Sequence, residues 1–325
     1  MQTRRLKARP AKVLLALALL VLGSCQGRKT KTIAVVPKGT SHLFWVAVQA
    51  GALAAGQKFG VQVLWNGPAQ ETEYDRQIQI VDSMIARRVD GLAVAAAERK
   101  ALVQSIDRAS SLGIPVTVFD SGVDTDNYMT FLATNNYEAG QMGAREMARL
   151  LGAKGQIAIM MHAPGSASTM DRERGFEDLI RTEFPAIQIV ARQYGLSDPS
   201  KARTAAENIL TAHPDISGIF ASSEPSSVGT SLALKSRSLA GKIKFVAFDA
   251  SESMIADLKG GAIDAIVVQD PFRMGYEAVQ TLVEKLRGSN PAKRIDLPAR
   301  VISSADLEKP ELQQLLHPDV RKYLP

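Results

Sequence analysis

Cysteine is almost absent from this chain: Cys25 is the only one among 325 residues. A single thiol excludes an internal disulfide and a metal site made of several thiolates. The histidines, at positions 42, 162, 213 and 317, lack the HExxH spacing of a zinc site. We therefore expect the folded part of the chain to hold no metal and no cofactor.

Motifs of nucleotide and hydrolytic chemistry are also missing. No P-loop or GxGxxG follows the apolar runs, and Ser166, within PGSAS, lacks the flanking glycines of a GxSxG elbow. Glu71 and Glu73 lie at the start of a predicted helix, where carboxylates favour the positive end of the helix dipole. These absences indicate that the chain is not an enzyme.

The excess of basic charge is confined to the beginning of the chain. The formal net charge is +6, and five Lys or Arg with no acidic residue precede Ser24, so about +1 remains for the rest. A remainder this small does not predict a nucleic-acid partner.

The sequence at this end of the chain has the pattern of an export signal. The basic residues are followed by the apolar run Val13–Leu22 and by Leu-Gly-Ser-Cys. The run is about half of the roughly 20 residues that a membrane-spanning helix needs. Leu-Gly-Ser-Cys resembles a bacterial lipobox, which implies a signal peptide at 1–24, a lipid on Cys25 and a tether at 25–31. Arg4-Arg5 leaves a twin-arginine signal open as the alternative to a plain basic region.

The rest of the chain alternates apolar strands with amphipathic helices, which is typical of parallel sheets covered by helices on both faces. The first strand series is predicted at Ile33–Val36, Val61–Trp65, Gly91–Ala95, Val116–Phe119 and Thr130–Ala133. The second is predicted at Gln156–Met161, Ile187–Gln193, Gly218–Ala221, Lys244–Phe248 and Ala265–Val268. Helices are predicted at Val46–Phe59, Tyr74–Arg87, Lys100–Leu112, Tyr137–Leu151, Arg172–Thr182, Lys201–Ala212 and Ser251–Lys259. Two such series predict two similar lobes.

Polar side chains follow the strands of both series. The carboxyl ends of parallel strands hold the ligands of open α/β sheets, so a cleft between the lobes would be lined by these side chains. They are Lys38, His42, Asp120, Ser121, Asn135, Arg172, Ser223, Asp249 and Gln269. Phe44 and Trp45 lie beside them and can stack on a flat apolar face. This mixture of donors and acceptors suits a ligand with several hydroxyls.

Each of these residues also has a purely structural interpretation. Asp120 and Asp249 could be turn or cap residues, and Asn135 could cap the helix that follows it. Arg172 could be one more solvated charge, and the two aromatic residues could anchor the first helix to the sheet. The shared position of these residues at strand ends is what favours a site.

The order of several short motifs resembles the periplasmic sugar-binding proteins of ribose-type ABC importers, which share their fold with the effector domains of LacI-type repressors. The resemblance covers about 32–288. The motifs are PKGTSHLFW, IPVTVFDSG, ATNNYEAG, SASTMDRERGF, LTAHPDISGIFASSEPSSVG, FVAFDAS and VVQDP, beginning at Pro37, Ile114, Ala133, Ser166, Leu210, Phe245 and Val267.

The resemblance implies a periplasmic-binding-protein-like type I fold of class α/β, with two doubly wound parallel-sheet lobes joined by a three-stranded hinge. The N-terminal lobe would comprise 32–133 and 270–297, and the C-terminal lobe 134–269 and 298–325. The crossings would lie near Asn135, near Gln269 and near Leu297–Ile302. The resemblance also implies that Phe44 and Trp45 flank a sugar ring.

In the same way, Asp120 and Asp249 would accept hydrogen bonds from sugar hydroxyls, Arg172 would donate, and Asn135 and Gln269 would complete the shell. The chain departs from ribose binders at four positions. His42 replaces Asn, Ser121 replaces Arg, Ser223 replaces Asn, and Lys38 stands where a small polar residue is usual. The ligand could therefore be a polyol, another pentose or hexose, or a weakly anionic sugar derivative.

The implied function is capture of a sugar or sugar-like ligand between two closing lobes, followed by delivery to an ABC permease. We expect a monomer in the periplasm or on the outer face of the membrane, held there only by its lipid. An alternative is a sensor whose closed form is recognised by a chemoreceptor or sensor kinase. A repressor is not expected, because the residues before Ile33 are an export signal rather than a helix-turn-helix.

Overall fold

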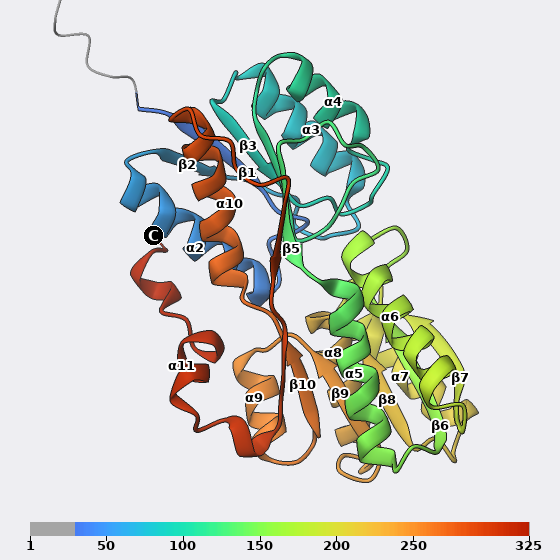
Figure 1. Cartoon of the computed structure of the whole chain (residues 1–325). Coiled ribbons are helices and arrows are strands. Elements are labelled where there is room, and N and C mark those ends of the chain that lie inside the picture. Colours follow the sequence, from blue (N-terminus) through green and yellow to red (C-terminus); the bar gives the residue numbers. More distant parts are fainter. Residues whose placement is uncertain (1–29, 325) are drawn as a thin grey trace, which may run out of the picture.

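The computed structural model describes residues 30–324, so the predicted signal peptide, Cys25 and most of the tether lie outside the described residues. These residues form two lobes, one above the other in Figure 1. Each lobe contains a six-stranded sheet. Among the described residues, no helix combines the length and apolarity needed to cross a bilayer.

The sheet of the N-terminal lobe has the strand order β11-β5-β4-β3-β1-β2, and all of its pairs are parallel. Its strands are β1 (Thr32–Val36), β2 (Gln62–Trp65), β3 (Gly91–Val94), β4 (Val116–Phe119), β5 (Thr130–Thr134) and β11 (Arg294–Leu297). The central strands are buried on both faces, which explains why their sequences are predominantly apolar.

The sheet of the C-terminal lobe has the order β12-β10-β9-β8-β6-β7, with β12 antiparallel at its edge. Its strands are β6 (Gly155–Met161), β7 (Ile187–Tyr194), β8 (Gly218–Ala221), β9 (Lys244–Phe248), β10 (Ala265–Val268) and β12 (Arg300–Ile302). The ten predicted strands are confirmed to within one residue at each end, and β11 and β12 add a sixth strand to each sheet.

Helices cover both faces of each sheet. They are α2 (Leu43–Phe59), α3 (Tyr74–Ala86), α4 (Val103–Ser111), α5 (Asn136–Leu151), α6 (Ala167–Glu183), α7 (Pro199–Ala212), α8 (Glu224–Ser236), α9 (Glu252–Lys259), α10 (Pro271–Leu286) and α11 (Pro310–Leu316). Three predicted starts were wrong by three residues or more. The start of α4 was predicted too early, at Lys100 rather than Val103. Two starts were predicted too late: α2 begins at Leu43 rather than Val46, and α6 begins at Ala167 rather than Arg172. Both missed turns lie at the cleft, where tertiary contacts rather than apolar periodicity hold the first turn.

Glycines bring one helix pair of each lobe unusually close together. In the N-terminal lobe, a Cβ added to Gly51 of α2 would overlap the carbonyl of Phe272 in α10, and one on Gly275 would overlap that of Val48. In the C-terminal lobe, Gly140 of α5 has the same relationship to the carbonyl of Arg172 in α6. Backbone contact of this kind fixes each helix relative to its partner, and with it the loops at the helix ends.

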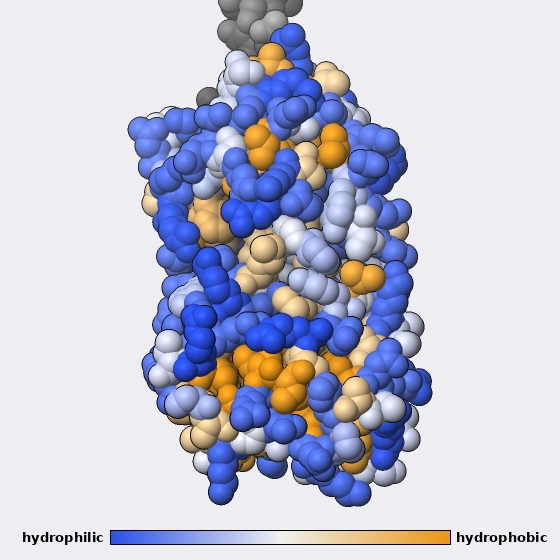
Figure 2. Space-filling view, turned by 90° about the vertical axis from the view of Figure 1, so that its right-hand side faces the viewer, coloured by the Kyte–Doolittle hydropathy of each residue, from blue (hydrophilic) through white to orange (hydrophobic). Residues whose placement is uncertain are grey.

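The chain crosses between the sheets three times: between β5 and α5, between β10 and α10, and between β11 and β12. Beyond β12, Leu312 of α11 joins the core of the C-terminal lobe. The chain then returns, and Tyr323 packs against Phe272 of α10 at a ring distance of 5.7 Å. The C-terminus therefore lies beside the N-terminal lobe (Figure 1). On the face drawn in Figure 2, hydrophilic side chains dominate, and apolar residues gather mainly over the lower, C-terminal lobe.

Candidate functional site

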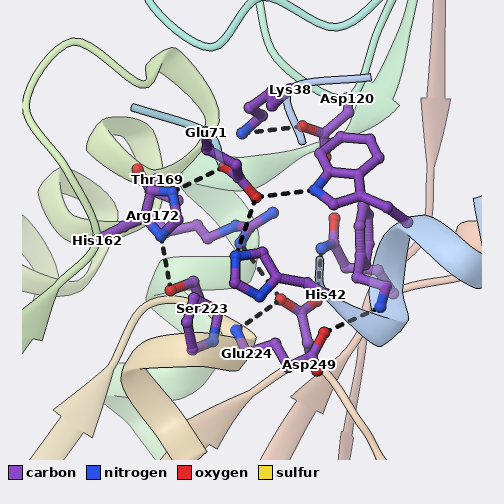
Figure 3. A pocket seen from close by; sticks show the side chains of 14 residues that line it. Lys38, His42, Glu71, Asp120, His162, Thr169, Arg172, Ser223, Glu224 and Asp249 are labelled. Atoms are coloured by element: carbon purple, nitrogen blue, oxygen red, sulfur yellow. Dashed lines mark hydrogen bonds and ion pairs between the residues drawn. The ribbon is translucent and has the colours of Figure 1, made fainter. Parts of the chain in front are cut away.

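A small cavity lies between the two lobes, at the carboxyl ends of their strands (Figure 3). Its volume is about 30 Å³, counting the positions that the centre of a water molecule can occupy. Nine of the eleven side chains predicted for the site line it: Lys38, His42, Phe44, Trp45, Asp120, Arg172, Ser223, Asp249 and Gln269. The lining also includes Glu71, His162, Thr169, Glu224 and Pro225.

Asp120 and Asp249 occupy equivalent places in the two lobes. Asp120 follows β4 with φ of 58°, and Asp249 follows β9 with φ of 65°, so both have left-handed backbones. Each N–H donates to the neighbouring strand, to Leu132 and to Val267 respectively, at 2.9 Å. Aspartate tolerates this conformation better than most residues, and strain of this kind gathers at functional sites. The backbone thus directs one buried carboxylate into the cleft from each lobe.

The ammonium group of Lys38 is already neutralised by the protein. Its Nζ lies 3.0 Å from Oδ2 of Asp120, and both side chains are almost fully buried. The same Nζ donates across the cleft to the hydroxyls of Ser166 and Ser168, at 3.2 and 2.9 Å. Lys38 is therefore committed to Asp120 and to the other lobe, which removes the reason to expect an anionic ligand.

Arg172 forms part of the wall of the C-terminal lobe. Its Nε donates to Asn136 Oδ1 at 2.7 Å, and its Nη1 donates to the carbonyl of Ser222 at 3.0 Å. Its guanidinium lies 4.0 Å from the ring centre of Phe248 and 3.9 Å from Asp249 Oδ2. Burial raises the pKa of Asp249, and this nearby guanidinium opposes the rise. Because Arg172 is buried and bonded, it is not a solvated surface charge.

The two aromatic residues differ in exposure. Trp45 is 2% exposed, belongs to the core of the N-terminal lobe, and contacts Phe119 edge-on at 6.3 Å. Its Nε1 donates to Glu71 Oε1 at 2.8 Å. Phe44 is half-buried and meets the Trp45 ring at 90° and 5.0 Å. Phe44 thus offers the more accessible surface, while Trp45 both anchors α2 and lines the cavity.

Glu71 and His162 connect the lobes inside the cavity. Oε2 of Glu71 lies 2.9 Å from Nε2 of His162, and Nδ1 of His162 lies 2.9 Å from the Ser223 hydroxyl. Burial opposes ionisation of Glu71, but His162, with Lys38 and His42, outweighs it and holds the pKa of Glu71 well below its usual range. The prediction that Glu71 serves a helix dipole was wrong, because its carboxylate faces the cleft.

Glu224 also reaches across the cleft. Its Oε2 accepts from the N–H of Phe44 at 2.9 Å and its Oε1 from that of Leu43 at 3.3 Å. Burial raises the pKa of Glu224 to about 7; the Phe44 N–H opposes the rise and Asp249 adds to it. The predicted set did not include this side chain, although Glu224 follows directly on Ser223.

Two predicted residues lie outside the cavity lining. Asn135 caps α5, since its Oδ1 accepts from the Glu138 N–H. Its neighbour Asn136 instead points to the site through its bond to Arg172. Ser121 is buried, and its hydroxyl accepts from the Ser168 N–H at 3.2 Å, so it joins the lobes behind the cavity. In this structure Asn135 thus acts as a helix cap, and Ser121 acts as a contact between the lobes.

Acceptors are left over among the residues that face the cleft. Gln269 donates from Nε2 to Asp249 Oδ1 at 2.7 Å, and among the described residues its buried Oε1 has no hydrogen-bond partner. A buried acceptor without a partner is unfavourable, and a ligand hydroxyl or amine would satisfy it. In the part of the chain that the structure describes, no cluster of three or more His, Cys, Asp or Glu could hold a metal.

Comparison with known proteins assigns this two-lobed chain to a family. The sequence profile of the periplasmic binding protein domain matches residues 33–290. The chain belongs to the periplasmic binding protein family. The resemblance and the α/β fold class predicted from the sequence are therefore confirmed.

Several members of this family align over nearly their whole length. A ribose import binding protein of Bacillus subtilis is 26% identical over 303 residues, covering 89% of this chain and 97% of that protein. A D-apiose import binding protein of Paraburkholderia graminis is 27% identical over 278 residues, covering 85% and 88%.

Solved structures give the same result. A carbohydrate transporter solute binding protein from Agrobacterium radiobacter, in complex with D-arabinose, superposes with a TM-score of 0.87. It is 30% identical and covers 89% of this chain and 100% of that one. An ABC transporter solute binding protein from Agrobacterium vitis, with bound D-fucose, gives 0.85 at 33% identity, covering 88% and 100%.

Membership in a family of binding proteins explains one arrangement that resembles enzyme chemistry. Ser223, His162 and Glu71 are connected in the order of a serine hydrolase triad. However, Glu71 lies in the N-terminal lobe and the other two in the C-terminal lobe, so the chain of bonds requires the lobes to meet. In a periplasmic binding protein, which is not an enzyme, the bond between Glu71 and His162 instead joins the two lobes across the cavity.

Proposed function

We propose that this protein captures a monosaccharide between its lobes and presents its closed form to the permease of an ABC importer. The observation that carries the proposal is the pair Asp120 and Asp249, two buried carboxylates aimed into one interlobe cavity by equivalent strained turns. Gln269 Oε1, which has no hydrogen-bond partner in the described part of the chain, adds a further acceptor. Sugar hydroxyls are donors that would satisfy all three groups.

The names of similar proteins support a sugar. Two relatives are named as import binding proteins for ribose and D-apiose. Three similar structures hold D-arabinose, α-D-tagatopyranose and D-fucose. The small cavity favours a single monosaccharide ring over an oligosaccharide. Phe44 would pack on the apolar face of that ring, as aromatic side chains do in such sites.

Lobe closure would give the ligand its affinity. A sugar that contacts both lobes only when they meet shifts the equilibrium toward the closed form by its differential affinity. The bonds between the lobes, from Lys38 to Ser168 and from Glu71 to His162, support this step, because they join polar groups that would separate if the lobes opened.

The test is calorimetric titration and thermal unfolding of the protein with D-ribose, D-apiose, D-arabinose, D-fucose, D-tagatose and D-allose. D-galacturonate and ribitol would represent sugar acids and polyols. A ligand that binds only the folded state raises the melting temperature. We expect at least one neutral monosaccharide to bind and D-galacturonate not to bind. Failure of all eight compounds with well-folded protein would refute the proposal.

We further propose that the protein is a lipoprotein on the outer face of a membrane. The support is the order of basic residues, apolar run and Leu-Gly-Ser-Cys at the start of the sequence. Expression of the full chain and of Cys25→Ser in a bacterial host, followed by membrane fractionation, tests this. The wild type should sediment with membranes and incorporate labelled palmitate, and the variant should do neither.

A further inference from the structure

We infer that Glu224 is a positioning residue for lobe closure: carried by the C-terminal lobe, it caps helix α2 of the N-terminal lobe only when the lobes meet. The inference rests on the proposed function, because closure matters here as the step that binds a ligand. Figure 3 shows the Glu224 side chain between the start of α2 and the Asp249 loop.

The first turn of α2 has no cap of its own. Its N-cap residue, His42, makes no side-chain cap bond, and the first turn contains no acidic residue. The opening N–H groups of a helix need acceptors from outside it. For α2 these acceptors come from the other lobe, as Glu224 Oε2 and Oε1 lie 2.9 and 3.3 Å from the N–H groups of Phe44 and Leu43.

The C-terminal lobe holds Glu224 in place for this contact. Glu224 is the first residue of α8, directly after Ser223, and its own N–H donates to Asp249 Oδ2 at 3.1 Å. The partners on α2 are 180 and 181 residues away and belong to the other sheet. Separation of the lobes must therefore break both bonds and return the carboxylate and the two N–H groups to water.

Two acidic groups near Glu224 disfavour its charge. These are Asp249, from its own lobe, and Glu71, from the opposite lobe. Each has a positively charged or imidazole neighbour, since Arg172 lies 3.9 Å from Asp249 and His162 lies 2.9 Å from Glu71. The imidazole of His42, at the start of α2, is bonded to Ser197 and lies 3.8 Å from Glu71. Within residues 30–324, the Glu224 carboxylate accepts hydrogen bonds only from the N–H groups of Leu43 and Phe44.

A dependence of closure on pH follows from this environment. Burial in the closed form raises the pKa of Glu224 to about 7, from 4.5 for a glutamate carboxyl in water. The closed form therefore takes up a proton between these values, and closure becomes more favourable as the pH falls. For a pKa near 7 in the closed form, the equilibrium constant for closure should increase about tenfold when the pH falls from 8 to 6.

Two substitutions separate charge from capping. Glu224→Gln keeps the length and one acceptor but is uncharged at every pH, so the ratio of wild-type to variant affinity should change about tenfold between pH 8 and pH 6. Glu224→Ala removes the cap and should weaken binding at least fivefold at both pH values. Glu183→Gln, which makes the same charge change at an exposed position of the C-terminal lobe, is the control and should match the wild type.

The readouts are dissociation constants for the six neutral sugars named above and the radius of gyration of the sugar-free protein from small-angle scattering at both pH values. The wild type should be more compact at pH 6 than at pH 8, and Glu224→Gln should not change. The inference is overturned if Glu224→Gln keeps the full pH dependence or if Glu224→Ala closes and binds like the wild type. Closure that responds to pH without binding of any sugar would refute the proposed function alone.

Discussion

Glu71 and His162 lie 91 residues apart in the sequence and in different lobes, yet their side chains meet at 2.9 Å inside the cavity. Glu71 also accepts from Trp45, and His162 is bonded to Ser223. His162 thus faces Glu71 with Nε2 and the Ser223 hydroxyl with Nδ1, both at 2.9 Å. A chain of bonds thus runs from the aromatic core of one lobe to the first turn of α8 in the other.

This pair should be energetically coupled. Glu71→Ala and His162→Ala should each weaken sugar binding at least tenfold, because each leaves a buried polar partner unsatisfied. The double variant should be less weakened than the sum of the two, with a coupling energy of about 1–3 kcal/mol. Titration calorimetry in a double-mutant cycle measures this. The exposed pair Arg203 and Glu207 is the control and should couple by less than about 0.5 kcal/mol.

Asp120 should be needed for stability as well as for binding. Asp120→Asn leaves the ammonium of Lys38 buried without its counter-charge, which costs about 3–5 kcal/mol in such pairs. The double variant Lys38→Met with Asp120→Asn should recover most of the melting temperature and remain unable to bind a sugar. Thermal unfolding and titration of the wild type and the two variants test this. Unchanged unfolding of Asp120→Asn would show that the pair contributes little.

The glycine contact between α2 and α10 should be intolerant of any side chain. In Gly51→Ala the new methyl group would overlap the carbonyl of Phe272, so the helices must separate. Overpacking of a tight core typically costs about 1–3 kcal/mol, occasionally more. Chemical denaturation should show a lower free energy of unfolding for Gly51→Ala. Gln57→Ala, at an exposed position of the same helix, should stay within about 0.5 kcal/mol of the wild type.

Glu173 should make stability depend on pH. It is buried behind the cavity, where its Oε1 accepts from the His162 N–H and the Ser222 hydroxyl. Burial raises its pKa to about 7, and these two bonds oppose the rise. A carboxyl whose folded-state pKa is raised contributes stability that is full below the unfolded value and is lost as the pH rises through about 7.

Glu173→Gln should therefore unfold with a larger free energy than the wild type at pH 8, by on the order of 1–3 kcal/mol, and the advantage should shrink toward pH 5. Denaturant titrations at the two pH values measure the difference. A variant that is less stable than the wild type at pH 8 would mean that the charge of Glu173 is stabilised by its surroundings.

The strands were predictable because their signal is local. β3 is apolar throughout, β4 is apolar except for Thr117, and Asp or Pro precedes each of them. Strands buried in a parallel sheet favour such runs. The positions of Asp120 and Asp249 followed, because the residue after a parallel strand lies at the ligand edge whichever way the helices pack. The first turn of α6 was missed, since Ser168 and Thr169 carry no apolar periodicity and are held by contacts made only in the folded lobe.

The sequence by itself determined the two-lobed α/β architecture, the family, and which strand ends face the cleft, because hydrophobic periodicity and turn residues act over short distances. Only the tertiary structure decided how the charges pair. In the sequence Lys38 suggests an anionic ligand, but in the fold Asp120 lies 3.0 Å away and neutralises it. In the sequence Glu71 lies near a helix start, but in the fold its partner is His162. The role of a buried charge depends on the group it pairs with, and these partners come from distant segments that only folding and lobe closure bring together.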